Sequence, residues 1–399
     1  MNITIVGGGF GGIKAALELS KDRRNHVTLI TDKPDFQYYP ALYSSATGHS
    51  HLESWVPLGT IFADDDVQVH IDRIEGVDKK EKTLKGKSGT TYHFDICIFA
   101  IGTVTTYFGI KGLDTYAYGI KSAEEIKRLK QHLYTDIAEN HTLDKHYVVV
   151  GGGPTGVELS SALGSYIKRL CKRYNVEDSH ISVDLIEAAP RILPRMHEKT
   201  SKKVQKRLEK LGVNVQVGKK VEAASADDLI VSGESIDSRT VIWTSGVMNH
   251  PFFKENGFTL SQNGRVAVDE YMQVEKDIYV IGDNADTPYT GLAQTALHDA
   301  LYVAHSIKRT NSGKQPKKYK AVKPPVVVPV GERWAVFEWH WLRIYGWISA
   351  VLRRAADFIG YSDMLPIGQA LGVWRASTVI EDDYFTPTLK DTDNSKTPR

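Results

Sequence analysis

Residues 3–12 read ITIVGGGFGG, a short run rich in β-branched side chains that ends in a cluster of glycines. Residues 13–19, IKAALEL, follow with apolar side chains at the spacing of a buried helix face. The next apolar run, HVTLI at residues 26–30, has the composition of a strand. This order predicts a βαβ unit in which the glycines form the turn before the helix.

The pattern returns at residues 147–159, where YVVV leads into GGGPTG and then VEL. SVDLI at residues 182–186 supplies the strand that follows. A single glycine turn is a weak signal, because such turns also have purely structural roles. Two turns, each between an apolar strand and a helix, predict an α/β fold with two Rossmann-like dinucleotide-binding domains.

The glycine turns have the chemistry that a pyrophosphate requires. Backbone N–H groups and the positive end of a helix dipole bind the anion, and glycine keeps side chains out of the way. We assign the first turn to one dinucleotide through Gly7, Gly9, Phe10, Gly11 and Gly12. We assign the second turn to another dinucleotide through Gly151, Gly153, Pro154, Thr155 and Gly156.

An acidic residue at the end of the second strand of such a unit reads the ribose hydroxyls. Glu187 directly follows the strand at 182–186, and a carboxylate there favours the 2′-hydroxyl of NADH over the 2′-phosphate of NADPH. In the first unit Thr31 takes this place and Asp32 comes one residue later. This departs from the usual pattern and leaves the ribose contact of Asp32 open.

A third apolar strand, residues 277–281, runs into Gly282 and Asp283. A carboxylate at this end of a strand can accept hydrogen bonds from the ribityl chain of a flavin. A Gly-Asp pair by itself more often marks a turn. Beside two glycine turns it indicates FAD.

Composition excludes several classes of protein. The chain has 399 residues with 50 Lys and Arg against 48 Asp and Glu, a net charge of +2, which argues against a nucleic-acid partner. Its two cysteines, Cys97 and Cys171, form neither a disulfide framework nor a metal or dithiol motif. We expect no signal peptide and no membrane span.

The ordered set of motifs resembles the type II NADH:quinone oxidoreductases, non-proton-pumping NADH dehydrogenases of the two-dinucleotide-binding-domain flavoprotein superfamily. The resemblance covers residues 1 to about 310. Besides the two glycine turns it is carried by YPALY at 39–43, ATG at 46–48, AIG at 100–102, YFGI at 107–110, EAAPRILP at 187–194, WTSGV at 243–247, IGD at 281–283 and AQTA at 293–296.

The resemblance implies non-covalent FAD on the N-terminal unit and NADH on the middle unit. In the implied reaction, NADH gives a hydride to the flavin, and the reduced flavin passes two electrons to a membrane quinone without proton pumping. The resemblance also adds cofactor-binding residues: Pro40, Ala100, Ile101, Gly102, Gly246, Gly282, Asp283, Ala293 and Gln294.

Three side chains are candidates for catalysis. The resemblance places Glu158, two residues past the second turn, near the nicotinamide and flavin; otherwise it is a first-turn glutamate that complements the helix dipole. The family's quinone motif Ala-Gln-x-Ala-x-Gln reads AQTALH at residues 293–298, with histidine in place of the second glutamine. A spacing of four puts Gln294 and His298 on one helix face, where both can line a quinone site. The alternative is that His298 is hydrogen-bonded in a domain contact.

We expect a glutathione-reductase-like arrangement in which the NADH domain is inserted in the FAD domain. The expected boundaries are 1–115 and 264–320 for the FAD-binding domain, 116–263 for the NADH-binding domain, 321–389 for a C-terminal membrane-association region and 390–399 for a disordered tail.

The C-terminal region is expected to hold an amphipathic helix from residue 341 to 359. One face would carry Trp341, Ile344, Tyr345, Ile348, Leu352, Ala355 and Ile359, and the other Arg343, Arg353, Arg354 and Asp357. Aromatic residues and arginines on such a helix favour a monotopic anchor, which the resemblance places at the cytoplasmic face of the cell membrane. A helix packed on the protein body, or on a second subunit in a homodimer, is the alternative.

Other functions are consistent with parts of the sequence. A sulfide:quinone oxidoreductase needs cysteines near the flavin, and neither cysteine is so placed. A disulfide reductase would need a Cys-x-x-Cys motif, which is absent. An NADH-dependent reductase of a ferredoxin-like protein or of oxygen, or an FAD- and NADH-binding redox sensor, remains as an alternative function.

Overall fold

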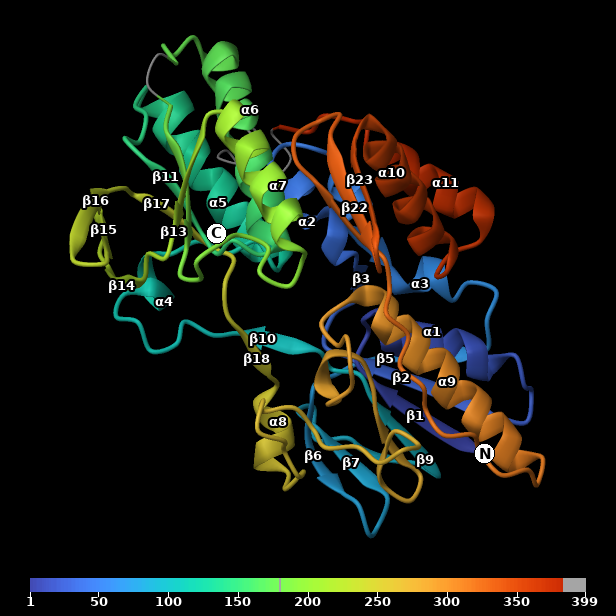
Figure 1. Ribbon diagram of the computed structural model, residues 1–399. Coiled ribbons are helices and arrows are strands. Elements are labelled where there is room, and N and C mark those ends of the chain that lie inside the picture. The colour runs from blue at the N-terminus through green and yellow to red at the C-terminus, as the bar shows by residue number, and fades with distance from the viewer. Residues whose placement is uncertain (179–180, 383–399) are drawn as a thin grey trace, which may run out of the picture.

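The computed structural model describes residues 1–178 and 181–382 (Figure 1). Its larger sheet has the strand order β19-β20-β9-β1-β2-β5, and every pair except β19–β20 is parallel. Helices α1 and α9 pack against each other beside this sheet. These elements are β1 (Asn2–Val6), α1 (Phe10–Ser20), β2 (His26–Thr31), β5 (Val67–Ile71), β9 (Ile96–Phe99), β19 (Gln273–Glu275), β20 (Ile278–Val280) and α9 (Ala293–Asn311).

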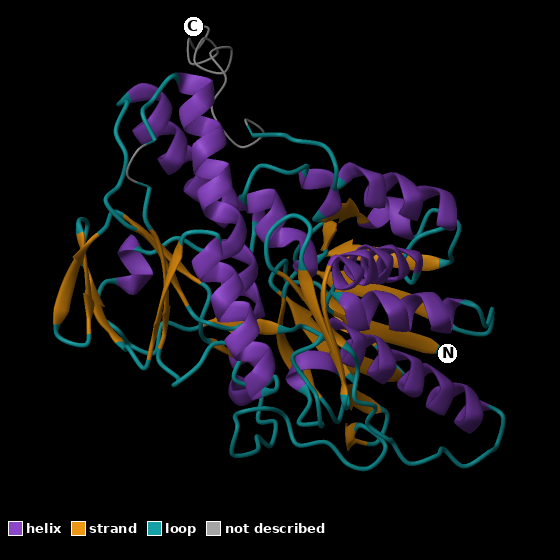
Figure 2. Cartoon of the chain, turned by 45° about the horizontal axis from the view of Figure 1, so that its top comes forward, coloured by secondary structure: helices purple, strands orange, loops and turns teal. Residues whose placement is uncertain are grey.

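A second, four-stranded sheet is entirely parallel, with the order β13-β12-β11-β17. A three-stranded antiparallel meander lies at its side, and Figure 2 shows the strands of the molecule in separate groups with helices between and beside them. The elements are α5 (Ala123–Tyr134), β11 (Tyr147–Val150), α6 (Pro154–Tyr174), β12 (Val183–Glu187), α7 (Glu198–Lys210), β13 (Val213–Val217), β14 (Val221–Ala224), β15 (Asp228–Val231), β16 (Glu234–Asp237) and β17 (Thr240–Trp243). The predicted α/β fold with two Rossmann-like units is confirmed.

A two-stranded antiparallel ribbon connects the units where the chain passes from one to the other. It pairs β10 (Thr103–Thr105) with β18 (Val247–Asn249). Helix α8 (Pro251–Glu255) comes next, and its phenylalanines pack in the core of the first unit around Phe99. Helix α8, which lies inside the expected range 116–263, thus packs with the first unit.

The C-terminal region forms a small sheet followed by two helices. Strands β21 (Val326–Pro329), β22 (Ala335–Trp339) and β23 (Leu342–Gly346) are antiparallel neighbours, and α10 (Trp347–Ser362) and α11 (Ile367–Ala376) follow. The prediction of a helix from residue 341 is wrong in its first part. Trp341 lies in the turn and residues 342–346 form a strand paired with β22, and Gly346, with a positive φ of +95°, ends that strand. The predicted tail at 390–399 lies outside the described residues.

Shorter elements fill the connections: β3 (Asp35–Gln37), η1 (Tyr39–Ala41), α2 (Leu42–Ala46), η2 (His51–Glu53), β4 (Trp55–Pro57), α3 (Leu58–Ile61), β6 (Ile74–Asp78), β7 (Thr83–Gly86), β8 (Thr91–His93), α4 (Leu113–Tyr116), η3 (Thr135–Glu139) and η4 (Gly282–Asn284). Within the ranges described, no helix combines the length and the apolar character that crossing a bilayer requires.

Candidate active site

The two glycine turns have the same geometry. Gly7 and Gly151 follow the central strands β1 and β11 with φ of +114° and +118°, a conformation that side chains rarely adopt. A Cβ atom on Gly12 would collide with the carbonyl oxygen of Gly7, and one on Gly156 with that of Gly151. Both helices therefore pack against their own turns only because glycine stands at these places.

The space in front of each helix is open. A Cβ atom on Gly9 or Gly153 would meet no atom within 4 Å, and neither residue caps its helix through a side chain. No acidic residue lies in the first turn of α1 or α6, and Pro154 and Thr155 begin α6. The free N–H groups and the helix dipole therefore face room for a pyrophosphate, so both turns fit a dinucleotide.

Backbone amides hold the Glu187 carboxylate beside the second turn. Its Oε2 accepts a hydrogen bond from the Gly152 N–H and its Oε1 one from the Ala189 N–H, each at 2.6 Å. Two fixed hydrogen bonds orient the side chain at the carboxyl end of β12, where the ribose of a bound dinucleotide would lie.

The equivalent edge of the first unit is arranged differently. Thr31, the last residue of β2, is buried under the turn, and its Oγ1 would lie 2.7 Å from a Cβ atom on Gly8. Asp32 follows and is exposed. The carboxylate available at this strand end is therefore that of Asp32, one residue later than in the second unit.

Asp283 lies in η4 at the end of β20. Burial raises the pKa of its carboxyl, and its Oδ1 accepts a hydrogen bond from the Gly291 N–H at 3.1 Å. A buried residue that our sequence reasoning missed, Asp299 on α9, accepts from the Gly282 N–H at 3.0 Å. Its Oδ1 also accepts from the Tyr319 hydroxyl at 2.6 Å. The hydrogen bond from the Gly282 N–H to Asp299 connects the segment of Gly282 and Asp283 to α9.

Asn284 is a second residue that sequence reasoning missed. Its Oδ1 accepts from the Gly102 N–H at 2.8 Å, and its Nδ2 donates to the Gly102 carbonyl at 2.6 Å and to Asn249 Oδ1 at 2.8 Å. It thus joins the segment of Ala100, Ile101 and Gly102, which packs against Gly7, to the ribbon between the units. Its position directly after Asp283 was the one sequence feature that could have indicated that Asn284 belongs to the site.

The predicted quinone residues lie one turn apart on α9, which begins at Ala293. Gln294 is exposed. His298 is half-buried, and its Nε2 lies 2.9 Å from the Lys320 carbonyl oxygen, with its ring 5.6 Å from that of Tyr319. His298 is therefore hydrogen-bonded to a segment within the same expected range, 264–320, and not across a domain boundary.

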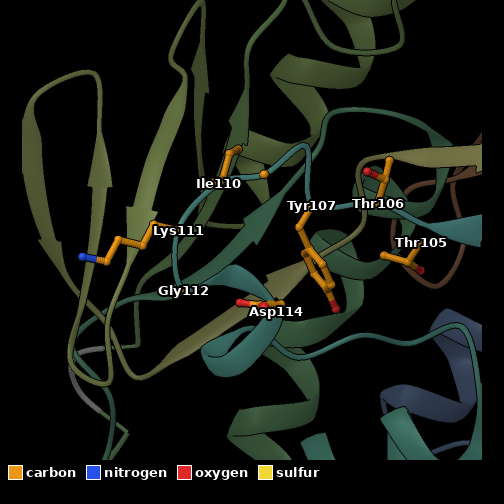
Figure 3. Close-up of a pocket in the computed structure, with 8 residues that line it drawn as sticks. Thr105, Thr106, Tyr107, Ile110, Lys111, Gly112 and Asp114 are labelled. Atoms are coloured by element: carbon orange, nitrogen blue, oxygen red, sulfur yellow. The ribbon is translucent and has the colours of Figure 1, made fainter.

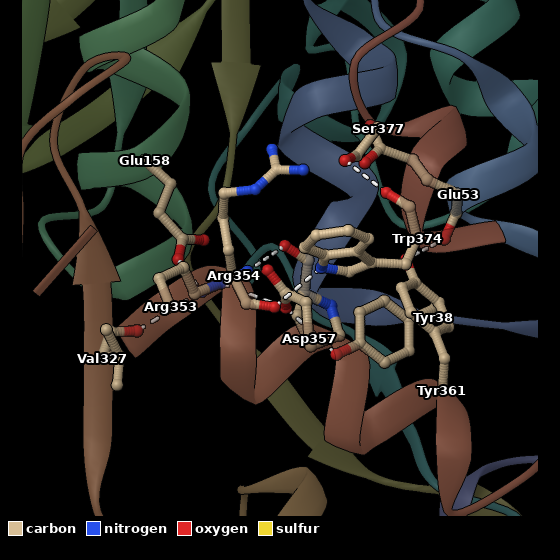
Figure 4. A network of polar contacts seen from close by, with 11 residues as sticks. Tyr38, Glu53, Glu158, Val327, Arg353, Arg354, Asp357, Tyr361, Trp374 and Ser377 are labelled. Atoms are coloured by element: carbon tan, nitrogen blue, oxygen red, sulfur yellow. Dashed lines mark hydrogen bonds and ion pairs between the residues drawn. The ribbon is translucent and has the colours of Figure 1, made fainter. Parts of the chain in front are cut away.

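Glu158 is buried on α6 and forms an ion pair with Arg353 of α10, whose Nη1 lies 3.2 Å from Glu158 Oε1 (Figure 4). Burial raises the pKa of Glu158 to about 7, and the charge of Arg353 opposes that rise. Arg353 also donates to Asp357 at 2.9 Å and to the Pro40 carbonyl at 2.7 Å. Tyr38 donates to the same Asp357 at 3.1 Å.

This network shows which side of the C-terminal helix faces the protein body. Arg353 and Asp357, expected on the face opposite the apolar one, point inward and join α10 to α6 and η1. Apolar side chains are exposed on the outer side, with Trp347 70%, Val351 56% and Ile359 61% exposed, and Arg354 is exposed among them. Buried charges face the protein body because Glu158, the Pro40 carbonyl and Tyr38 provide partners there.

Two hollows flank the segment that connects β10 to α4. A groove of about 500 Å³ is lined by Thr105, Thr106, Tyr107, Gly109, Ile110, Lys111, Gly112 and Asp114, most of which Figure 3 labels. A second hollow of about 210 Å³ lies at the carboxyl ends of β11, β12 and β17 and includes Glu187 and Phe108. Gly246, with φ of +70°, lies under the Phe108 ring.

With two dinucleotide turns in one chain, the fold is that of a flavin- and pyridine-nucleotide-dependent oxidoreductase. The chain belongs to the pyridine nucleotide-disulphide oxidoreductase family, whose model matches residues 1–300. It is 26% identical over 379 residues to the type II NADH:quinone oxidoreductase of Staphylococcus saprophyticus, covering 89% of this chain and 94% of that protein. The fold is similar to that of NDH2 from Plasmodium falciparum, solved in complex with NADH: the TM-score is 0.84 at 19% identity, over 94% of this chain and 97% of that one. The resemblance stated from the motifs is confirmed.

The fold is also shared with the sulfide:quinone oxidoreductase of Aquifex aeolicus, with a TM-score of 0.73 at 19% identity over 89% of each chain. Cys97 lies in β9 and Cys171 in α6, and both are buried free thiols. Burial raises the pKa of each thiol, which disfavours the reactive thiolate. Neither cysteine has the environment that sulfur transfer requires.

Proposed function

We propose that this protein is an FAD-dependent oxidoreductase that takes a hydride from NADH and passes two electrons to a membrane quinone. The observation that carries the proposal is the pair of equivalent glycine turns, open at Gly9 and Gly153, with an oriented acceptor, Glu187, beside the second. When bound, FAD supplies the redox chemistry that side chains lack. The names of the curated relatives support the choice of NADH and quinone.

The first turn would hold FAD without a covalent bond and the second would hold NADH. At the first, the α1 N–H groups bind the pyrophosphate, Asp32 accepts from the ribose, and Asp283 accepts from the ribityl chain. Ala100, Ile101 and Gly102 form the neighbouring backbone. At the second, Glu187 accepts from the ribose hydroxyls and would repel a 2′-phosphate, which favours NADH.

Glu158 would exchange a proton beside the acceptor. Reduction of a quinone to a quinol consumes two protons, and a carboxyl with a pKa of about 7 releases and regains one near neutral pH. Arg353 and Asp357 orient the carboxyl through the ion pair and its hydrogen bonds. Gln294, exposed at the start of α9, is the candidate hydrogen-bond donor to a quinone carbonyl. His298 would support that site through the Lys320 contact.

The apolar outer side of α10 supports peripheral attachment to a membrane. Trp347, Ile348, Val351 and Ile359 are exposed along one side of a helix whose other side is bonded to the protein body. A helix of this kind lies in the interface with its apolar side among the acyl chains. A lipid-soluble quinone is reached from that surface, which for an enzyme that oxidises NADH is the cytoplasmic face.

A spectroscopic titration tests the proposal. The purified yellow protein is reduced with NADH under anaerobic conditions, and menaquinone or ubiquinone analogues are then added. We expect NADH to bleach the flavin and a quinone to restore its absorbance. Bleaching without reoxidation by any quinone would favour a reductase of another acceptor or a redox sensor, and absence of bleaching would contradict NADH use altogether.

A further inference from the structure

The segment after β10 crosses the second unit at the carboxyl ends of its strands. Backbone and side-chain contacts hold it there: the Thr106 N–H donates to the Gly246 carbonyl at 3.1 Å, and Trp243 Nε1 donates to the Thr106 carbonyl at 3.0 Å. The Phe108 N–H donates to Thr106 Oγ1 at 3.2 Å. The first two contacts fix the position of the segment relative to the end of β17 and the residues after it, and the third fixes the turn within the segment.

Phe108 stands out in this segment because it is both strained and exposed. Its φ is +54°, a left-handed conformation that is uncommon for a bulky residue, and 66% of its surface is open to solvent. Neither feature stabilises the free protein. Backbone strain kept at an exposed aromatic residue suggests a role in binding a ligand.

The Phe108 ring has a defined place. It packs at 6.3 Å from the Trp243 ring, with 68° between their planes. Beneath it lies Gly246, where a Cβ atom would come within 2.8 Å of the ring. The absence of a side chain at Gly246 therefore allows the ring to lie against the strand ends.

The ring forms one wall of the 210 Å³ hollow. Ile186 and Val221 contribute apolar surface to the same hollow, and Glu187 contributes its carboxylate. Lys219 and Lys220 also line it, and Lys219 is paired with Glu234 at 3.2 Å. An apolar slot beside a ribose-binding carboxylate has the shape and chemistry for a flat aromatic base.

We propose that Phe108 is a specificity-determining residue that packs on the adenine ring of NADH. This inference rests on the proposed function, because it assigns the second turn to NADH. The pyrophosphate at Gly153 and the ribose at Glu187 set the direction of the dinucleotide, so the base on the Glu187 side is adenine and not nicotinamide. The strained Phe108 backbone is retained because its ring gains a stacking partner on binding.

The test compares NADH with reduced nicotinamide mononucleotide, which lacks the adenosine half. The variants are Phe108→Asn, which removes the ring while asparagine tolerates the left-handed backbone, and Phe108→Tyr, which keeps it. Flavin bleaching measures the affinity for each reductant, and calorimetry measures binding of ADP-ribose, a readout that needs no turnover.

We expect Phe108→Asn to weaken NADH and ADP-ribose by roughly tenfold and to leave the mononucleotide unchanged. Phe108→Tyr should match the wild type. Equal weakening of NADH and the mononucleotide, or unchanged ADP-ribose binding, would overturn the assignment. Failure of the wild type to be bleached by NADH would instead contradict the proposed function, so the two failures are distinguishable.

Discussion

Arg353 Nη1 lies 3.2 Å from Glu158 Oε1, so a side chain of α10 neutralises a carboxyl one helical turn beyond the second glycine turn. The two side chains are 13% and 10% exposed, and 195 positions separate them in the chain. Breaking such a buried pair leaves an uncompensated charge, which costs more than the pair itself contributes. The C-terminal region is thereby joined electrostatically to the nucleotide-binding unit.

Replacing Glu158 with glutamine should separate the two halves of the reaction. Without an ionisable carboxyl, we expect reoxidation of the reduced protein by quinone to fall by roughly 10²-fold, while bleaching by NADH continues. In the wild type the quinone step should slow as the pH rises through about 7, because the proton-donating form of Glu158 is lost. Stopped-flow measurements from pH 5.5 to 8.5 check this. A pH profile that Glu158→Gln leaves unchanged would contradict the role.

Replacing Arg353 with methionine should move the pH profile of the quinone step to higher pH. The guanidinium lowers the pKa of Glu158, so its removal leaves burial as the dominant influence and raises the pKa further. The midpoint of the quinone step then moves to higher pH. Arg353→Lys, which retains a charge, should move it less. An equal shift of the midpoint in Arg353→Met and Arg353→Lys would show that the packing of Arg353, and not its charge, determines the pKa of Glu158. Thermal unfolding measures the accompanying loss of stability, about 3 kcal/mol for an unpaired buried charge.

Replacing Glu187 with serine together with Ala188→Arg should shift the preference toward NADPH. The first change removes the carboxylate that opposes a 2′-phosphate, and the second provides a cation for it. We expect the NADH to NADPH ratio of kcat/KM to fall by roughly tenfold or more. Ala188→Arg alone is the control. An unchanged ratio would show that Glu187 does not read the ribose.

The outer side of α10 predicts which residues attach the protein to lipid. Trp347→Ser and Val351→Asp should each lower the vesicle-bound fraction in flotation with phosphatidylglycerol vesicles, because each buried apolar side chain contributes about 1.5–3 kcal/mol. Ile71→Asp is a matched control, since Ile71 is 56% exposed on the edge strand β5, away from α10.

Analytical ultracentrifugation of the same variants tests whether a second copy of the chain, rather than lipid, covers the outer side of α10. If the wild type does not bind vesicles but forms a dimer that Trp347→Ser dissociates, the outer side of α10 is a subunit contact and the membrane assignment is wrong.

Glu53 predicts a pH dependence of stability that is separate from catalysis. It is 4% exposed, and its Oε1 has no hydrogen-bond partner among the described residues. Burial raises the pKa of its carboxyl from 4.5 to about 8. The folded state therefore holds a proton that the unfolded state releases, so the free energy of unfolding falls as the pH rises from about 4.5 to about 8.

Glu53→Gln should reduce this dependence and raise the Tm at pH 7.5. Glu81→Gln, which alters an exposed glutamate between β6 and β7, is the control and should leave the Tm unchanged. Differential scanning calorimetry at pH 5 and pH 7.5 checks both variants. A Tm difference between Glu53→Gln and wild type that is the same at both pH values would exclude titration of Glu53 as the cause.

Sequence patterns among residues close together in the chain predicted the geometry of the two dinucleotide-binding turns. Gly7 and Gly12, and likewise Gly151 and Gly156, form contacts within a few residues, so their spacing carries the geometry of the turn. Glu187 was predictable because a strand end places the next side chain beside that turn. The contacts of Asn284 and Asp299 were not predictable from the sequence, because each residue bonds to backbone groups that only the folded sheet brings near.

The C-terminal region shows the limit of such patterns. Periodicity assigned residues 341–346 to a helix, whereas pairing with β22 makes residues 342–346 a strand. It also placed Arg353 opposite the apolar face, but it did not reveal that the partners of Arg353 are Glu158 on α6 and the Pro40 carbonyl in η1.

Local sequence was sufficient to predict the α/β class, the two dinucleotide turns and the position of the Glu187 carboxylate beside the second turn, because these depend on backbone conformations that a few consecutive residues specify. Tertiary packing alone decided which side of α10 faces inward, that Arg353 meets Glu158, and that Phe108 lies over the ends of β11, β12 and β17. Those relationships join segments far apart in the chain, and their free energies depend on partners that no local pattern encodes.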